Sequence, residues 1–256
     1  MNWFKKELEV QPYSELAYIY DDVMAHVDYK TWAEFIHDII MSRSVPHINI
    51  LDVACGTGSL LLELENFHFQ LWGFDQSHAM LTIAKRKIEG RGCQIPIWQS
   101  NMTSFYVKKK FDVILCLYDS FNYLLEKRLW NNFFNAADAC LNHNGLIIFD
   151  ICTEKNSVKY FNNFFEKSKG KDYSYTRKSV FIKETLIHSN VFKINYDNSN
   201  IIFIERHEQR IYKIAEVIDF LSKSQFKLLN IYDDFSFRPA SENSLRAHFI
   251  LEKVKG

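Results

Sequence analysis

The sequence predicts an α/β fold in which a doubly wound parallel sheet carries an inserted antiparallel β-sheet. Between residues 47 and 151, short segments that are apolar almost throughout alternate with segments of helical periodicity. Buried strands separated by helices are typical of a parallel sheet that is covered on both faces. After about residue 150 the pattern changes, and from residue 172 to 212 runs rich in Tyr, Phe, Ile and Val dominate. Such runs, joined by turn residues, are typical of antiparallel strands.

Length and composition are typical of a soluble protein with a full hydrophobic core. The chain has 256 residues, of which 47% are hydrophobic and 24% are charged. Its 31 basic residues balance its 31 acidic residues, whereas nucleic-acid-binding proteins carry a basic excess. No apolar run approaches the roughly 18 residues that a membrane helix needs, and the opening MNWFKKELEV has no secretory pattern. We therefore expect a cytoplasmic protein that binds neither nucleic acid nor membrane.

The five cysteines indicate neither a metal site nor a disulfide framework. They form no C-x-x-C pair and have no metal-binding spacing with histidine. Most of them lie in apolar segments, where cysteine behaves as a small hydrophobic side chain. We expect reduced thiols and no metal.

Residues 1–45 are expected to form a helical cap before the sheet. Ser14 can cap a first helix with apolar positions at residues 16, 19, 20, 23 and 27. A second helix starts at Thr31, where Glu34 completes a capping box, and it should end before Pro46.

The alternating part of the chain supplies the parallel sheet. Strands are expected at residues 47–53, 69–75, 95–100, 111–118 and 146–151, and helices at residues 58–67, 77–90 and 127–141. Ser77 caps the second of these helices, and Asn144-Gly145 makes the turn into the last of these strands.

The later part of the chain supplies the inserted sheet. Antiparallel strands are expected at residues 179–188, 191–197 and 200–212, with turns at Ser189-Asn190 and at residues 197–199. A helix with Ile214, Val217, Ile218 and Leu221 on one side follows, and strands at residues 226–232 and 246–254 complete the chain. The predicted organisation is one domain formed by residues 1–151 and 213–256, interrupted by an insertion at residues 152–212.

The stretch LDVACGTGSL at residues 51–60 indicates a ligand without a phosphate. Its glycines, Gly56 and Gly58, follow a strand, but Leu61 stands where the dinucleotide motif G-x-G-x-x-G has its third glycine. Asp52 would repel a pyrophosphate but suits an ammonium group. Asp75, at the end of the next strand, can accept hydrogen bonds from both ribose hydroxyls. A ligand with a ribose, an amino-acid tail and no phosphate is S-adenosylmethionine.

Several motifs together resemble the class I S-adenosylmethionine-dependent methyltransferases, which have a Rossmann-like sheet. They are LDVACGTGSL, GFDQSHAM at residues 73–80, Asn101-Met102 and FDVILCLYDSFNYL at residues 111–124. Two further segments restrict the resemblance to one group of these enzymes. They are YSELAYIYDDVMAHVDYKTW at residues 13–32 and ERHEQRIY at residues 205–212. They resemble a bacterial small-molecule group similar to the amino-sugar N,N-dimethyltransferases and, more distantly, glycine N-methyltransferase. One interpretation of the insertion is that it covers the substrate side of the active site.

The resemblance also implies which residues hold the cofactor. For the methionine end these are Asp52, Ala54, Cys55, Gly56, Thr57 and Gly58. For the ribose and the adenine they are Asp75, Gln76, Met80, Asn101 and Met102, with the amide oxygen of Asn101 accepting from the adenine amino group. Leu117 and Tyr118 would face the sulfonium, and the segment that contains Tyr20 would close over the cofactor.

The loop CLYDSFNYL is the candidate for the substrate side, because open α/β sheets bind ligands beyond the carboxyl ends of their strands. The resemblance implies that Tyr123 lies near the nucleophile and that Tyr13 assists it, with Asp119 also at the substrate. Both tyrosines can alternatively be core residues. In the insertion, Arg206 and Arg210 alternate with Glu208 on one strand face and would suit an anionic group of the substrate. The insertion can also serve as a dimer surface, so we expect a monomer or a homodimer.

Methyl transfer from a sulfonium needs mainly proximity and alignment. No His-Asp pair of general-base type lies in the motif segments, which favours an amine or another atom that is already nucleophilic over a hydroxyl as the acceptor. Two alternatives stay open. One is an NAD-dependent oxidoreductase or epimerase, for which Tyr123 and Lys127 have the Y-x-x-x-K spacing. The other is a non-catalytic protein that binds S-adenosylmethionine.

Overall fold

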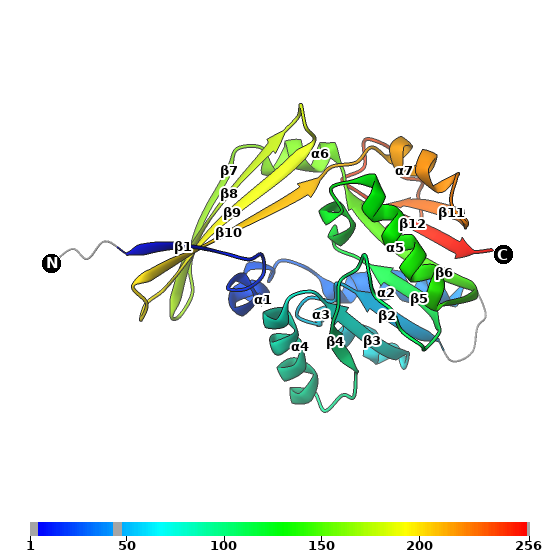
Figure 1. The fold of residues 1–256 in the computed structure, drawn as a ribbon, viewed down its shortest axis with the longest axis horizontal. Helices are drawn as coiled ribbons and strands as arrows, with labels where there is room; N and C mark the ends of the chain where they lie inside the picture. The colour runs from blue at the N-terminus through cyan, green and yellow to red at the C-terminus, as the bar shows by residue number, and fades with distance from the viewer. Residues whose placement is uncertain (1–4, 43–47, 255–256) are drawn as a thin grey trace.

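The computed structural model describes residues 5–42 and 48–254 and contains two β-sheets joined by the N-terminal segment (Figure 1). The larger sheet has seven strands in the order β11-β12-β6-β5-β2-β3-β4. Its strands are β2 (Asn49–Val53), β3 (Gln70–Asp75), β4 (Ile97–Gln99), β5 (Phe111–Cys116), β6 (Leu141–Cys152), β11 (Phe226–Asp233) and β12 (Arg246–Lys253). Strands β2 to β6 pair in parallel, and β12 is antiparallel to both of its neighbours. The predicted α/β class with a parallel-dominated sheet is confirmed.

Helices cover both faces of this sheet, which explains why its strands are apolar almost throughout. On one face lie α2 (Tyr29–Met41) and α3 (Ser59–Leu64), which is followed by η2 (Glu65–Phe67). On the other face lie α5 (Lys127–Cys140) and α7 (Ile214–Leu221). The helix α4 (His78–Gly90) begins where predicted, because the Ser77 side chain accepts a hydrogen bond from the backbone of Met80. Of the apolar residues predicted to line α7, Ile218 is exposed instead.

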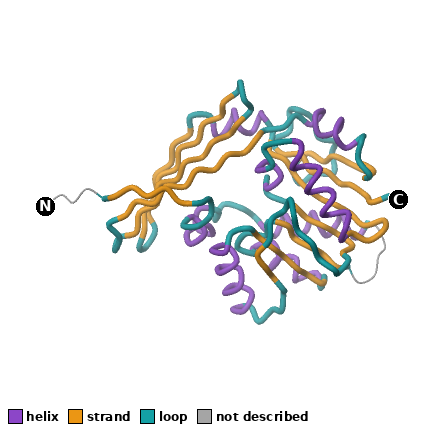
Figure 2. Tube along the Cα trace, in the orientation of Figure 1, coloured by secondary structure: helices purple, strands orange, loops and turns teal. Residues whose placement is uncertain are grey.

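The smaller sheet consists of the predicted insertion and one strand from the start of the chain (Figure 2). Its order is β1-β10-β9-β8-β7, with β1 (Lys6–Val10), β7 (Phe164–Lys169), β8 (Tyr173–Ile182), β9 (Ile187–Tyr196) and β10 (Ile201–Arg210). The short helical segments α6 (Glu154–Asn156) and η4 (Ser157–Phe161) connect β6 to β7. The predicted turn at Ser189-Asn190 is wrong, since both residues lie inside β9, whereas the turn at residues 197–199 is confirmed. The domain boundaries at residues 151 and 213 stay a prediction.

The N-terminal region differs from the predicted helical cap. Residues 6–10 form β1, and the first helical part is only η1 (Leu16–Ile19) followed by α1 (Tyr20–Val23). Ser14 does not cap it, because the Ser14 hydroxyl donates to the carbonyl of Gln11. The second helix begins two residues earlier than predicted, and its cap is Asp28, whose side chain accepts from the Thr31 backbone. Pro46 lies outside the described residues.

The segment η1–α1 packs on the smaller sheet while its other side faces the larger one. Leu16 and Ile19 form a buried cluster with side chains of β8 and β9, and η1 also contacts α4. The segment therefore bridges the two sheets near the carboxyl ends of β2, β3 and β5. None of the helices in residues 5–42 and 48–254 is long and apolar enough to cross a membrane.

Candidate active site

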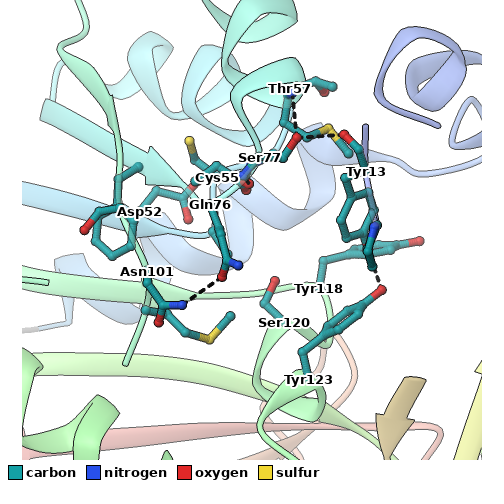
Figure 3. Close-up of a pocket in the computed structure, with 18 of the residues that line it drawn as sticks. Tyr13, Asp52, Cys55, Thr57, Gln76, Ser77, Asn101, Tyr118, Ser120 and Tyr123 are labelled. Atoms are coloured by element: carbon teal, nitrogen blue, oxygen red, sulfur yellow. Dashed lines mark hydrogen bonds between the residues drawn. The ribbon is translucent and has the colours of Figure 1, made fainter. Parts of the chain in front are cut away.

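A cavity of about 910 Å³ opens beyond the carboxyl ends of β2, β3 and β5. It lies where a doubly wound sheet places its ligand. The structure brings nearly all of the predicted cofactor residues to it (Figure 3). Those that line it are Tyr20, Asp52, Ala54, Cys55, Gly56, Thr57, Asp75, Gln76, Met80, Asn101, Met102, Leu117 and Tyr118.

The glycine turn after β2 shows why a third glycine is not required. Gly56 has a φ of +55° and borders open space, so a side chain there would enter the cavity. Gly58 does not line the cavity; it caps α3 with a φ of +73°, and an added Cβ would lie 3.3 Å from Ala84 Cβ. The close approach between helix and sheet occurs at Gly73, where an added Cβ would lie 2.8 Å from Leu61 Cδ1. The glycine that permits the packing of Leu61 therefore lies on β3.

Two buried carboxylates define the charge of this cavity. Burial and, to a lesser extent, the nearby Asp75 raise the pKa of Asp52 to about 8. Burial also raises the pKa of Asp75, against hydrogen bonds from Ser77 N at 2.8 Å and Gly56 N at 2.9 Å. None of the described side chains that line the cavity is a lysine or an arginine. Such a site disfavours a phosphate and fits a ligand with a sulfonium and an ammonium group, such as S-adenosylmethionine.

Asn101 lines the cavity in an orientation that differs from the predicted one. Its amide oxygen accepts from the backbone N–H of Thr103 at 2.8 Å and from the Thr103 hydroxyl at 2.7 Å. Its Nδ2 donates to Gln76 Oε1 at 2.9 Å. Because a backbone N–H requires an oxygen acceptor, this orientation is determined by Thr103. The expectation that the Asn101 oxygen receives the adenine amino group is therefore corrected.

The N-terminal segment closes over the cavity through contacts that sequence reasoning missed. Asp21 in α1 accepts from the Thr57 hydroxyl at 2.6 Å and from Lys87 Nζ at 2.7 Å. The Ser77 hydroxyl donates to the carbonyl of Tyr13 at 2.7 Å. These bonds connect α1 to the glycine turn and to α4, both of which border the cavity.

The two tyrosines predicted to be catalytic meet at the edge of this cavity. The hydroxyl oxygens of Tyr13 and Tyr123 lie 2.6 Å apart, as Figure 3 shows. The Tyr123 hydroxyl also lies 3.1 Å from His207 Nδ1, and His207 Nε2 lies 3.2 Å from Glu205 Oε2. Sequence reasoning missed this histidine–carboxylate pair although both residues lie in ERHEQRIY, because the alternating polar residues of that segment do not indicate which face of the strand is buried.

Glu205 also holds the start of the N-terminal segment. Its carboxylate accepts from the backbone N–H groups of Tyr13 at 2.6 Å, Glu15 at 2.6 Å and Leu16 at 2.8 Å. Burial tends to raise its pKa, but the hydrogen bonds from His207, Leu16 and Glu15 outweigh burial and lower it. Glu205 is therefore an ionised acceptor in the folded protein.

The acceptor role of Glu205 sets the direction of one hydrogen-bond chain. An ionised carboxylate only accepts, so His207 donates from Nε2 to Glu205. In the tautomer whose single ring hydrogen is on Nε2, the Nδ1 atom of His207 accepts from the Tyr123 hydroxyl. Tyr123 then has no proton left for Tyr13, so Tyr13 donates to Tyr123. Burial raises the pKa of both phenols well above the ordinary value, which keeps them protonated at neutral pH.

The predicted arginines lie elsewhere. Arg206 is on the exposed face of β10 and donates to Glu9 Oε1 at 3.0 Å. Arg210 contacts the carbonyl of Leu125 at 3.5 Å, and its guanidinium packs over the Tyr212 ring. Neither arginine lines a described cavity. The substrate roles of Arg206 and Arg210 stay predictions that these positions do not support.

The inward face of β10 carries the other set of alternating residues. Side chains on a strand alternate between faces, and both faces of ERHEQR are polar, so the sequence does not indicate which one is buried. In the structure the buried set is Glu205, His207 and Gln209.

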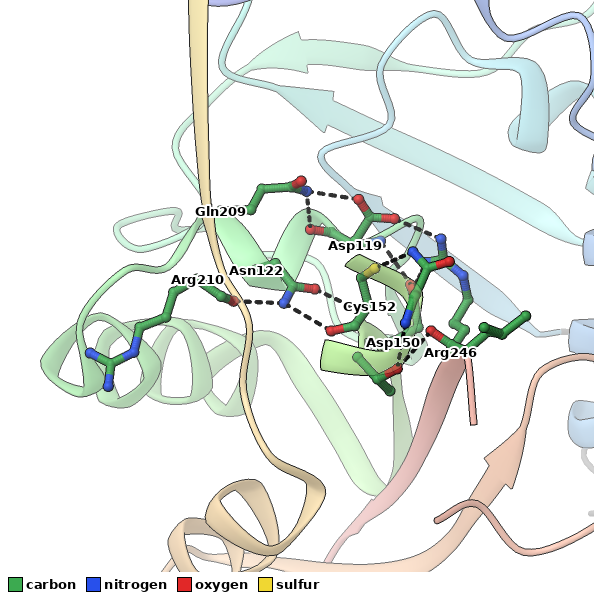
Figure 4. A network of polar contacts seen from close by, with 10 residues as sticks. Asp119, Asn122, Asp150, Cys152, Gln209, Arg210 and Arg246 are labelled. Atoms are coloured by element: carbon green, nitrogen blue, oxygen red, sulfur yellow. Dashed lines mark hydrogen bonds and ion pairs between the residues drawn. The ribbon is translucent and has the colours of Figure 1, made fainter. Parts of the chain in front are cut away.

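A second cavity of about 120 Å³ lies between the inward face of the smaller sheet and the larger sheet. Four tyrosines line both cavities and therefore stand between them: Tyr13, Tyr20, Tyr118 and Tyr123. In the second cavity, the predicted substrate residue Asp119 is already paired with two neighbours (Figure 4). Its carboxylate accepts from Arg246 Nη2 at 2.8 Å and from Gln209 Nε2 at 2.7 Å.

The backbone around the cavities is strained. Tyr13, Ala54, Tyr118 and Asp119 all have a φ between +51° and +61°. Residues other than glycine rarely adopt this conformation, and such strain clusters at functional sites. It supports the assignment of this region as the active site.

Comparisons with known proteins agree with this geometry. A family model described as a methyltransferase domain matches residues 50–145. A Geobacillus sp. (strain WCH70) protein assigned as a methyltransferase is 30% identical over 248 residues, which cover 94% of this chain and 99% of that protein.

Two solved structures have a similar fold over nearly the whole chain. An S-adenosylmethionine-dependent methyltransferase from Clostridium acetobutylicum ATCC 824 aligns with a TM-score of 0.81 and 26% identity, covering 95% of this chain and 99% of that one. The sugar N-methyltransferase KedS8 from Streptoalloteichus sp ATCC 53650 aligns with a TM-score of 0.74 and 20% identity, covering 93% of each chain. With a cavity that fits the donor and a relative that matches over nearly its whole length, the chain belongs to the S-adenosylmethionine-dependent methyltransferases.

Proposed function

We propose that this methyltransferase acts on a small molecule and transfers the methyl group to nitrogen, with the acceptor amine held at Tyr13. The observation that carries the proposal is the 2.6 Å contact between the hydroxyls of Tyr13 and Tyr123, at the boundary between the two cavities. When bound, S-adenosylmethionine supplies an electrophilic methyl group on a positively charged sulfur.

The direction of the hydrogen bonds favours an amine. Since Tyr13 donates its proton to Tyr123, the oxygen of Tyr13 keeps a lone pair that can accept from an amine N–H. An accepted N–H orients the amine while its own lone pair stays free to form the N–C bond. The S–C bond breaks in the same step and its electron pair stays on sulfur.

The same chain can remove the proton of an ammonium group. A proton accepted by Tyr13 can be matched by transfer from Tyr13 to Tyr123 and from Tyr123 to His207 Nδ1. Glu205 then stabilises the positively charged imidazole at 3.2 Å. A hydroxyl acceptor would need a stronger base than this chain offers, because the two phenols are held neutral by burial.

Two further observations support a small amine. The second cavity, at about 120 Å³, has room for only a small group. The fold is shared with a protein named as a sugar N-methyltransferase, which is a reason to include amino sugars among the acceptors tested. An amino sugar and a simple amine both satisfy the geometry.

The proposal is tested by measuring S-adenosylhomocysteine formation with primary and secondary amines, each matched with the alcohol of the same carbon skeleton. We expect turnover with amines and an N-methyl group in the product by mass spectrometry and NMR. Tyr13→Phe should lower the rate, whereas Tyr18→Phe, a change at an exposed tyrosine of the same segment, should not. Turnover confined to the alcohols would contradict the proposal.

The assembly is a separate proposal, either a monomer or a homodimer through the smaller sheet. Within the described part of the chain, β1 covers the β10 edge, and β1 and β7 form the outer edges of this sheet. Outer edges can pair with a second copy. Light scattering on the purified protein distinguishes a monomer from a dimer.

A further inference from the structure

Arg177 in β8 places a positive charge at the second cavity. Its Nε and Nη2 donate to Asn190 Oδ1 at 3.0 and 2.9 Å. The guanidinium also packs against three aromatic rings, with its carbon 4.9 Å from the Phe161 centroid, 5.4 Å from Phe192 and 5.8 Å from Phe164. These contacts fix the guanidinium, but none of them provides a negative charge.

Arg177 has no carboxylate partner among residues 5–42 and 48–254, since none lies within 4.0 Å of it. Glu166 is its neighbour across the strands, but the Glu166 carboxylate accepts from the Tyr175 hydroxyl at 2.6 Å. Burial lowers the pKa of Arg177, although a guanidinium remains protonated in proteins. The charge is therefore uncompensated by a direct contact.

The other arginine of this cavity is compensated. Arg246 pairs with Asp119 at 2.8 Å and with Asp150, so two carboxylates surround one guanidinium (Figure 4). Among the described residues that line the second cavity, Arg177 is thus the only lysine or arginine without a carboxylate in direct contact.

His188 on β9 is a second unsatisfied group in the same cavity. Its side chain is 3% exposed, and neither ring nitrogen has a hydrogen-bond partner among the described residues. Burial, and then the charge of Arg177, lower the pKa of His188 to about 4, so the imidazole is neutral and carries one N–H donor. A buried polar group without a partner is rare in folded proteins and needs a physical reason.

We propose that the second cavity binds a carboxylate of the methyl acceptor, with Arg177 as its charged ligand and His188 as a hydrogen-bond donor. The one positive charge of Arg177 matches a carboxylate better than a dianionic phosphate. The volume of about 120 Å³ corresponds to roughly four water-sized groups. The inference rests on the proposed function: with the amine at Tyr13 and the carboxylate at Arg177, the acceptor belongs to the amino acids or similar zwitterions.

The test compares kcat/KM for amino acids with kcat/KM for two matched compounds, the amide and the amine without the carboxylate. We expect the wild-type enzyme to prefer the amino acid. In Arg177→Met this preference should fall about 10- to 100-fold, because a charge-assisted pair to the substrate is lost. Arg177→Lys keeps the positive charge but cannot form bidentate hydrogen bonds, so it should retain part of the preference for the amino acid.

The matched control is Arg206→Met, the same substitution on the exposed face of the same sheet. It should keep the wild-type preference. The melting temperature and the affinity for S-adenosylhomocysteine show whether each variant is folded. A wild-type enzyme that prefers the amide or the plain amine would overturn the inference, and so would equal preferences in Arg177→Met and Arg206→Met.

A second measurement separates this inference from the proposed function. If no amine of any kind is methylated, nitrogen transfer is wrong, and the anion subsite is then decided by binding alone. For this purpose 13C-labelled acetate is titrated by NMR into protein saturated with S-adenosylhomocysteine. Binding that Arg177→Met abolishes keeps the subsite, whereas binding equal in both proteins, no binding, or tighter binding of inorganic phosphate overturns it.

Discussion

The hydroxyl oxygens of Tyr13 and Tyr123 lie 2.6 Å apart, although 110 residues separate them in the chain. Tyr13 precedes the first helical turn, and Tyr123 ends the short helical loop after β5. Their contact joins the N-terminal segment to the loop after β5, and both tyrosines line both cavities. The same contact begins the hydrogen-bond chain to His207 and Glu205.

Tyr123→Phe removes the oxygen that connects Tyr13 to His207. The rate should fall by roughly one to three orders of magnitude, as for a positioned acid–base group. The free energy of unfolding should fall by only about 1 kcal/mol, the usual net value of a buried hydrogen bond. Tyr106→Phe, at a residue that is 76% exposed, is the control. Full turnover in a stably folded Tyr123→Phe protein would show that Tyr123 is a core residue only.

Asp52 should make donor binding depend on pH. Its pKa is raised to about 8 in the protein, mainly by burial, whereas a cationic ligand binds the ionised carboxylate. The affinity for S-adenosylmethionine should therefore rise with pH up to about 8, by at most about tenfold per pH unit. Calorimetry in buffers of different ionisation enthalpy measures the protons released on binding. The Asp52→Asn variant should release fewer protons than the wild type when it binds S-adenosylmethionine. Equal proton release in the two proteins would mean that another group causes the pH dependence.

The same raised pKa affects stability with the opposite trend. In the folded state Asp52 binds its proton up to about pH 8, but an unfolded aspartate releases it near 3.8. Protonation thus favours the folded state, and the contribution of Asp52 to stability declines as pH rises from about 4 to about 8. Urea unfolding of wild type and Asp52→Asn across this range should show a smaller decline in the variant.

Asp21→Ala should weaken donor binding without changing the reaction itself. The substitution removes the acceptor of the Thr57 hydroxyl and of Lys87, which connect α1 to the border of the donor cavity. We expect the affinity for S-adenosylmethionine to fall about three- to tenfold, a moderate loss for a partly exposed contact. Glu34→Ala, at an exposed residue of α2, should have no effect. Unchanged affinity in Asp21→Ala would mean that α1 is no part of the donor site.

Glu205→Gln should lower both stability and activity. An amide in place of the carboxylate presents a donor to the N–H groups of Tyr13, Glu15 or Leu16, at a cost of about 1–3 kcal/mol. Tyr13 would then be held less firmly, so the rate should fall as well. Glu208→Gln, on the exposed face of the same strand, is the control.

The lowered pKa of Glu205 gives a further outcome for the same variant. A carboxylate with a depressed pKa contributes stability above its ordinary value of 4.5 and loses that contribution as pH falls below it. The difference in unfolding free energy between pH 7 and pH 4 should therefore be smaller in Glu205→Gln than in wild type. An equal difference would show that Glu205 is not the group responsible.

Local patterns in the sequence predicted the larger sheet well. Each of its first strands is an apolar run bounded by polar residues, and Ser77 caps α4 as its position indicates. The glycine turn and Asp75 predicted a donor site, and the structure gathers these residues around one cavity. The strand and helix predictions succeeded because each depends on residues that are close together in the chain.

The smaller sheet and its part of the site could not be predicted in the same way. The alternation in ERHEQR shows two polar faces, so the choice between Arg206 and His207 depends on what covers the strand. The strand β1 pairs with β10, which begins at residue 201. Nearly 200 residues separate the two strands, so no local sequence pattern indicates that they pair. For α2, Asp28 and Thr31 are both good capping residues, and the structure uses the first.

The parallel pairing of β1 with β10 has a consequence for synthesis on the ribosome. Tyr13 is 192 residues ahead of Glu205, which holds its backbone. At about 5–20 residues per second, the emerging chain waits roughly 10 to 40 seconds before that partner exists. During this time the nascent β1 has an unpaired edge, and the donor site has no cover. The nascent enzyme can therefore complete its active site only after β10 has left the exit tunnel. Only then can the N-terminal residues, which were synthesised first, pair with β10.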